Sequence, residues 1–139
     1  MDLKKVLISG LLAGLVMAVV GMLASRIFGV LFPQLNLEYE NAFLFRPWSD
    51  PLMLLYFLCP FVLSMALAWI WDKTKVIVAG AGWAEKGVKF ALAYWLVSLS
   101  GMLISYSSFP ISFFMVLSWT IVGLLQAICA GLVYAKINP

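Results

Sequence analysis

The sequence predicts an all-α integral membrane protein: a bundle of four transmembrane helices that forms a single transmembrane domain over residues 1–139. Two observations lead to this prediction. Hydrophobic residues make up 65% of the chain and charged residues 11%, which leaves too little polar surface for a water-soluble monomer. Four long segments are also apolar on every face, whereas the strands of a membrane β-barrel alternate polar and apolar residues.

Each of the four segments is long enough to cross a bilayer, because a helix needs about 20 apolar residues to span the hydrocarbon core. We place the spans at about residues 6–32, 51–71, 88–107 and 111–135.

Small residues recur along the first and fourth spans at the spacing of one helix face. The first span carries Gly10, Gly14, Ala18 and Gly21, and the fourth carries Gly123, Ala127 and Gly131. Lipid tails are as apolar as leucine, so membrane helices associate by close packing of such residues, for which GxxxG is one motif. We therefore expect these two helices to lie at the centre of the bundle. The alternative is that one of the stripes docks another subunit.

The second span contains two prolines with different expected effects. Pro51 follows Ser49 and Asp50, which can cap a helix, and proline is favourable at the first helical position. Pro60 lies in mid-span, where it removes a backbone hydrogen bond and leaves the carbonyl of Tyr56 without its usual donor. We expect a kink there, either purely structural or shaping a cavity or hinge.

The distribution of lysines predicts the orientation. All seven precede the first span, separate the second from the third, or follow the fourth: Lys4, Lys5, Lys73, Lys75, Lys86, Lys89 and Lys136. Basic residues near helix ends stay on the cytoplasmic side. We therefore expect both termini to be cytoplasmic, and the connections between spans one and two and between spans three and four to be external.

The external segment over residues 33–51 is too apolar and aromatic for a free loop, so we expect a short interfacial piece that caps the bundle. Five charged residues belong to this side of the membrane: Arg26, Glu38, Glu40, Arg46 and Asp50. If they lined a cavity, they could bind a zwitterionic or cationic headgroup or perform acid–base chemistry. If not, they form ion pairs that attach the segment to the bundle.

Little else in the sequence points to chemistry. The chain has no histidine, its two cysteines form no CxxC pair, and no acidic cluster has metal-site spacing, so we expect no metal and no cofactor. Gln126 is the polar residue that stands out at membrane depth, about 15 Å from Lys136 along the helix. It could bind a ligand or pore water, or bond to a neighbouring helix.

These absences favour a non-catalytic scaffold or accessory subunit of a membrane complex that packs through its Gly/Ala stripes, as a homo-oligomer or with other proteins. One alternative is an oligomeric channel or transporter for a small or lipidic molecule, whose path includes Gln126. A second is an interfacial lipid-modifying enzyme that uses the external charged residues. The net charge of +3 is spread along the cytoplasmic boundary, which indicates membrane lipids as partners rather than nucleic acid.

Overall fold

The computed structural model describes residues 2–139, and every regular element in this range is a helix. The elements are α1 (Leu3–Leu31), α2 (Pro33–Tyr39), the 3₁₀ turn η1 (Pro51–Met53), α3 (Leu54–Thr74), α4 (Trp83–Ser108) and α5 (Phe113–Ile137). Four helices are long and apolar enough to cross a membrane: α1, α3 together with η1, α4 and α5. The prediction of four membrane-length helices is therefore confirmed.

The helix ends differ from the predicted spans where polar residues set the boundary. Helix α4 begins at Trp83 rather than near residue 88, because a helical turn that carries Glu85 continues beyond the apolar run. Helix α5 begins at Phe113 rather than at residue 111. Ser112 remains in an extended conformation and caps this helix, accepting a hydrogen bond from the Met115 N–H over 3.1 Å.

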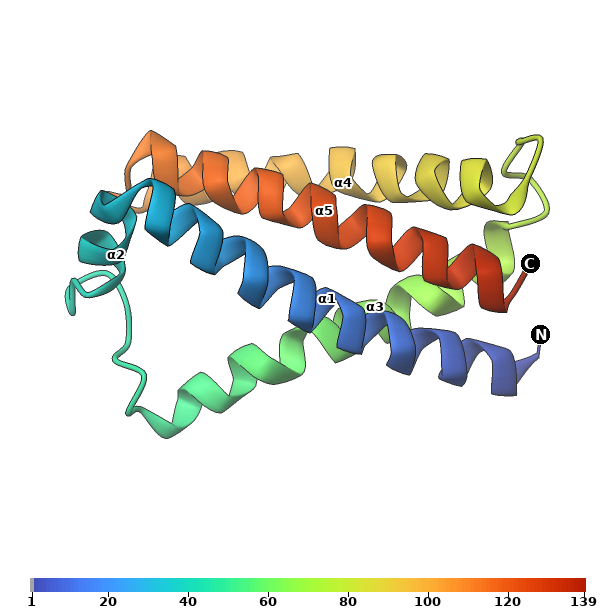
Figure 1. Cartoon of the computed structure of the whole chain (residues 1–139), viewed down its shortest axis with the longest axis horizontal. Coiled ribbons are helices and arrows are strands. Elements are labelled where there is room, and N and C mark those ends of the chain that lie inside the picture. Colours follow the sequence, from blue (N-terminus) through green and yellow to red (C-terminus); the bar gives the residue numbers. More distant parts are fainter. Residues whose placement is uncertain (1) are drawn as a thin grey trace.

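The four long helices are arranged in a row in which α1 and α5 are central. Helix α1 packs against α3 and α5, and α5 packs against α4 (Figure 1). Both chain ends lie at one end of the molecule, which we call the terminal end, and α2 lies at the opposite end, which we call the α2 end (Figure 1).

All four long helices contribute to an apolar core in the terminal half of the molecule. Its buried members are Val6, Ala13, Met17, Leu67, Ala68, Trp71, Phe90, Ala130, Tyr134 and Ala135. The rings of Trp71, Phe90 and Tyr134 form its centre, because Phe90 meets Trp71 at 5.3 Å and Tyr134 at 6.1 Å between ring centroids. Offset and edge-on ring pairs of this kind add to the stability from burial alone.

A second core lies at the α2 end and contains no residue of α3. Its buried members are Leu35, Ile111, Met115 and Val116, and Phe28, Phe45, Met102 and Trp119 are among the residues packed against them. Helix α3 diverges from α1 toward this end (Figure 1). Every residue from Leu54 to Cys59 is exposed, whereas the buried residues of α3 begin at Ser64. Pro60 lies inside α3, just where its packed portion ends.

The connection between α1 and α3 folds back over the α2 end. Helix α2 begins with Pro33 at its first position, and its Leu35 is buried in the second core. Asn36 Nδ2 donates to the carbonyl of Gly29 over 3.1 Å, which holds α2 against α1. Asp50 caps η1 by accepting from the Leu52 N–H over 2.9 Å, and Pro51 follows it, so the predicted start of this helix is confirmed.

Candidate functional site

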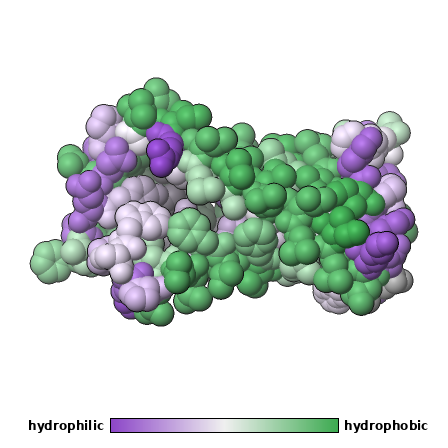
Figure 2. Space-filling view, turned by 60° about the horizontal axis from the view of Figure 1, so that its bottom comes forward, coloured by the Kyte–Doolittle hydropathy of each residue, from purple (hydrophilic) through white to green (hydrophobic). Residues whose placement is uncertain are grey.

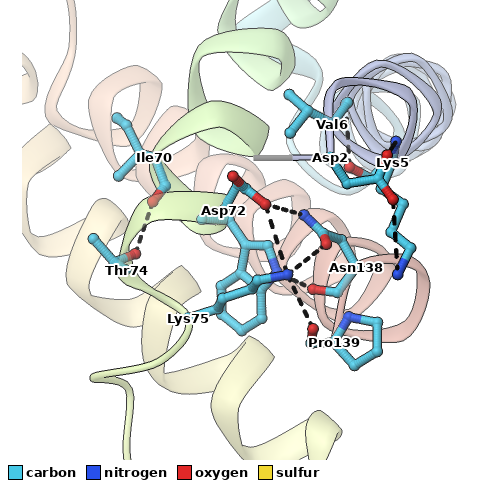
Figure 3. Close-up of polar contacts among 11 residues, drawn as sticks. Asp2, Lys5, Val6, Ile70, Asp72, Thr74, Lys75, Asn138 and Pro139 are labelled. Carbon is cyan, nitrogen blue, oxygen red and sulfur yellow. Dashed lines mark hydrogen bonds and ion pairs between the residues drawn. The ribbon is translucent and has the colours of Figure 1, made fainter.

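Three side chains form a closed polar network at the terminal end of the molecule (Figure 3). Asn138 Nδ2 donates to Asp72 Oδ1 over 3.0 Å, and Lys75 Nζ donates to Asn138 Oδ1 over 2.6 Å. Lys75 Nζ also lies 3.6 Å from Asp72 Oδ1. Trp71 Nε1 donates to the backbone carbonyl of Asn138 over 2.8 Å, and Asn138 is fully buried.

This network joins α3 to the segment that follows α5 and so holds these two segments together. No buried polar side-chain atom within residues 2–139 lacks a hydrogen-bond partner. The same range holds no group of three or more His, Cys, Asp or Glu side chains arranged to bind a metal ion. A polar network in which every member is satisfied stabilises one arrangement of the helices.

Side chains also form hydrogen bonds between helices within the spans. Ser64 Oγ on α3 donates to the Gly10 carbonyl of α1 over 2.8 Å, and the Tyr134 hydroxyl on α5 donates to the Ser64 carbonyl over 3.1 Å. Gln126 Nε2 donates to the Met17 carbonyl of α1 over 2.8 Å. The Gln126 amide is thus engaged by a neighbouring helix, which is one of the two roles that the sequence left open.

Most of the small residues singled out from the sequence lie at helix contacts inside the chain. A Cβ atom at Gly10 would come within 2.4 Å of Met65 Sδ, one at Gly14 within 2.7 Å of Ser64 Oγ, and one at Gly21 within 2.4 Å of Gln126 Nε2. Ala127 is buried and Ala18 is half-buried.

Helices α4 and α5 approach each other closely at two glycines. A Cβ at Gly131 would lie 2.3 Å from the Gly87 carbonyl oxygen, and a Cβ at Gly87 would lie 2.5 Å from the Gly131 oxygen. Gly123 differs from the other glycines of the predicted stripes, because a Cβ there has no neighbouring atom within 4 Å. The expected contact at Gly123 is therefore not made within the described chain. Helix α3 has already diverged at that level.

The five charged residues expected to cluster at the α2 end are divided among separate contacts. Arg46 Nη1 pairs with Asp50 Oδ2 at 2.8 Å. Hydrogen bonds from the Leu52 N–H and from Arg46 hold the pKa of Asp50 below its usual range. Glu38 instead accepts from Ser112, and neither Arg26 nor Glu40 enters an ion pair among residues 2–139.

Glu38 has a structural task that the sequence did not reveal. Its carboxylate accepts from both the backbone N–H and the hydroxyl of Ser112, each over 2.6 Å, and so it sits at the N-terminus of α5. A negative charge is favourable there because the first amides of a helix carry a partial positive charge. The separation of the two residues along the chain hid this contact. Ser112, near the start of the last predicted span, was the one local signal of a helix cap.

An aromatic cluster lies beside this contact. Trp119 Nε1 donates to the Tyr39 hydroxyl, and the Phe45 ring lies 5.3 Å from Tyr39 and 6.2 Å from Trp119 between centroids. Burial raises the pKa of Tyr39, so its hydroxyl stays neutral at physiological pH.

Trp119 also borders two cavities of different size. The larger has a volume of about 160 Å³ and is lined by Leu44, Phe45, Ser105, Phe109, Ile111 and Trp119. The smaller, of about 20 Å³, lies between α1, α2 and α5 and has room for about one water molecule.

The first half of α3 diverges from the other helices and makes little contact with α4 or α5, and we call the space between them the gap (Figure 1). Gly123 lies about three turns before Tyr134 on the face of α5 that turns to α3, and Gly101 lies about three turns after Phe90 on the corresponding face of α4. A Cβ at either glycine would meet nothing within 4 Å. The face shown in Figure 2 is hollowed toward the α2 end, and white side chains of intermediate hydropathy lie in the hollow.

Comparisons with protein-family models, curated proteins and solved structures find no match to this chain.

Proposed function

We propose that the protein is a non-catalytic component of a membrane complex, and that a transmembrane helix of a second copy or of another subunit occupies the gap beside α3. The observation that carries this proposal is the open space over Gly101 and Gly123. A helix that packs against glycine makes close contact, because the two backbones can approach each other. A lipid chain makes fewer contacts with glycine than with leucine. The face that carries Gly101 and Gly123 is the kind of small-residue surface that an accessory subunit leaves uncovered for its partner.

The uneven burial of the helices supports the same proposal. In the most apolar stretch of α1, 39% of residues are buried within the chain, but the share is 17% for α3 and 17% for α4. The main contacts of α4 are with α5. Most residues in the apolar stretches of these two helices are therefore not buried within the chain.

We further propose that the terminal end faces the cytoplasm and that the segment over residues 33–51 is an external cap at the membrane interface. All seven lysines belong to the helix ends and connection at the terminal end, while Arg26 and Arg46 lie at the α2 end. Such an excess of basic residues characterises the cytoplasmic side. Trp48 and Phe43 lie in the cap and are exposed, as expected for aromatic side chains at headgroup level.

The alternative functions have less support. A transport path would need polar space from the cap to Gln126, but neither cavity is lined by Gln126. A lipid-modifying enzyme would need the external charges to converge, but Glu38 binds Ser112 while Arg46 pairs with Asp50.

Site-specific photocrosslinking in native membranes tests the proposal. A benzophenone amino acid at Gly123 has room in the gap, and one at Leu15, an exposed position on α1, serves as a matched lipid-facing control. We expect a protein adduct from position 123 and only lipid adducts from position 15. Mass spectrometry of the adduct, together with native mass spectrometry of the gently extracted protein, identifies the partner. Lipid adducts alone at both positions would overturn the proposal.

A further inference from the structure

The larger cavity beside Trp119 is separate from the surface assigned to a partner helix. It lies where the end of α4, the turn before α5 and the segment over residues 33–50 meet. Five of its six lining side chains are aliphatic or aromatic, and the sixth is Ser105. The Ser105 hydroxyl donates to the Gly101 carbonyl over 2.9 Å, so its proton is already engaged.

The other polar side-chain atom of the walls is likewise occupied. Trp119 Nε1, the donor of the indole, bonds to the Tyr39 hydroxyl. Trp119 and Phe45 contact each other edge to face, and Ile111 is buried. These contacts hold the Trp119, Phe45 and Ile111 walls in place without a ligand. The cavity therefore offers a preformed apolar surface with few groups that would hold water.

The volume indicates the class of ligand. An enclosed apolar cavity of about 150 Å³ lined by such side chains binds benzene or xenon, and this partly open cavity has a similar volume of about 160 Å³. We propose that it binds an uncharged apolar group about the size of a benzene ring. Such a group can be the end of a membrane lipid chain or part of a free hydrophobic molecule, and the cavity is partly open, which permits entry.

Fluorobenzene is a suitable probe, because its ¹⁹F signal broadens and shifts on binding to the detergent-solubilised full chain. We expect saturable binding to the natural protein and at least a tenfold loss of affinity in Ser105→Phe, whose ring fills the cavity. Ser107→Phe is the matched control, because Ser107 makes the same kind of back-bond on the same helix, to Ile104 over 3.0 Å, but does not line the cavity. It should retain the affinity. An unsaturable signal, or equal binding by both variants, would overturn the proposal.

A second variant covers the case in which Ser105→Phe does not fold. Phe109→Ala enlarges the cavity, so it should bind 1-fluoronaphthalene more tightly than the natural protein does, and an unchanged preference for the smaller probe would count against the site.

Vesicles of chain-brominated phosphatidylcholine then distinguish the two sources of the apolar group. Quenching that is lost in Trp119→Phe and relieved by fluorobenzene identifies a lipid chain in the cavity. Fluorobenzene binding without such quenching identifies a free molecule as the ligand. The inference does not depend on a partner helix, and both probes are read in the absence of partner proteins.

Discussion

Replacing Gly131 by alanine should loosen α4 from α5, because the new methyl group would point into the backbone of the facing helix. Its carbon would lie 2.3 Å from the Gly87 oxygen and 3.0 Å from Ala91 Cβ, whereas ordinary contact begins at 3.4 Å. The shortfall of roughly 1 Å against a backbone atom cannot be relieved by a rotamer change in a close-packed contact, so the helices must move apart. Overpacking of this kind costs about 1–3 kcal/mol.

The same substitution at Gly123 provides an internal control. Both glycines lie in the interior of α5, so the gain in helix propensity from glycine to alanine, about 0.5–1 kcal/mol in water, enters both variants and cancels in the comparison. A Cβ at Gly123 meets nothing within 4 Å. We therefore expect Gly123→Ala to be neutral or slightly stabilising, and Gly131→Ala to be less stable than Gly123→Ala by about 1–3 kcal/mol.

The assay is reversible unfolding of the purified protein in mixed micelles, with dodecyl sulfate as denaturant and helix content as the signal. The difference between the two variants, rather than either value alone, tests the packing. Equal free energies of unfolding would refute the close approach of Gly131 to Gly87. A large loss of stability in Gly123→Ala, measured in the isolated protein, would refute the open gap.

Three further predictions concern polar contacts. Asn138→Ala removes the donor to Asp72 and should destabilise the protein by about 1–3 kcal/mol in the same unfolding assay, because a largely buried carboxylate loses a hydrogen bond; an unchanged midpoint would show that the network contributes nothing. Glu38→Gln should lower the free energy of unfolding by about 0.5–2 kcal/mol, because the N-terminus of α5 loses a charged acceptor. Glu40→Gln is the control and should leave this free energy unchanged, because Glu40 forms no ion pair among residues 2–139. The pKa of Asp50 is lowered in the folded protein, so its cap is fully present above the ordinary aspartate pKa of about 3.9 and is lost as the pH falls below that value. The amide ¹H shift of Leu52 should report this acid transition, and a transition that persists in Asp50→Asn would contradict the assignment.

Local sequence was sufficient for the features that depend on neighbours along the chain. The four apolar runs predicted four membrane-length helices, because length and hydropathy decide whether a segment can span a bilayer. The start of the second span was likewise predicted from Asp50 and Pro51, since capping is a property of adjacent residues. The same reasoning placed Pro60 inside a helix, where it lies.

Hydrogen-bond partners that are distant along the chain could not be predicted from local sequence. The charges at the α2 end were expected to line a cavity or to form ion pairs that attach the segment to the bundle, but Glu38 binds Ser112, which belongs to the turn before α5. Asn138 carried no signal of its contacts with Asp72 and Lys75 either. A polar side chain has many possible partners of suitable chemistry, and only the chain path decides which of them comes within hydrogen-bond distance.

The sequence by itself determined that the protein has membrane-length apolar helices and where its small residues lie along them. Hydropathy and helix spacing are properties of the chain. Only the tertiary structure decided how each small residue is used. Gly131 meets Gly87, whereas Gly123 faces open space although it belongs to the same predicted stripe. The reason is that α3 packs on α1 only beyond Pro60 and diverges before it, and a stripe of glycine cannot specify which helix will lie against each of its turns.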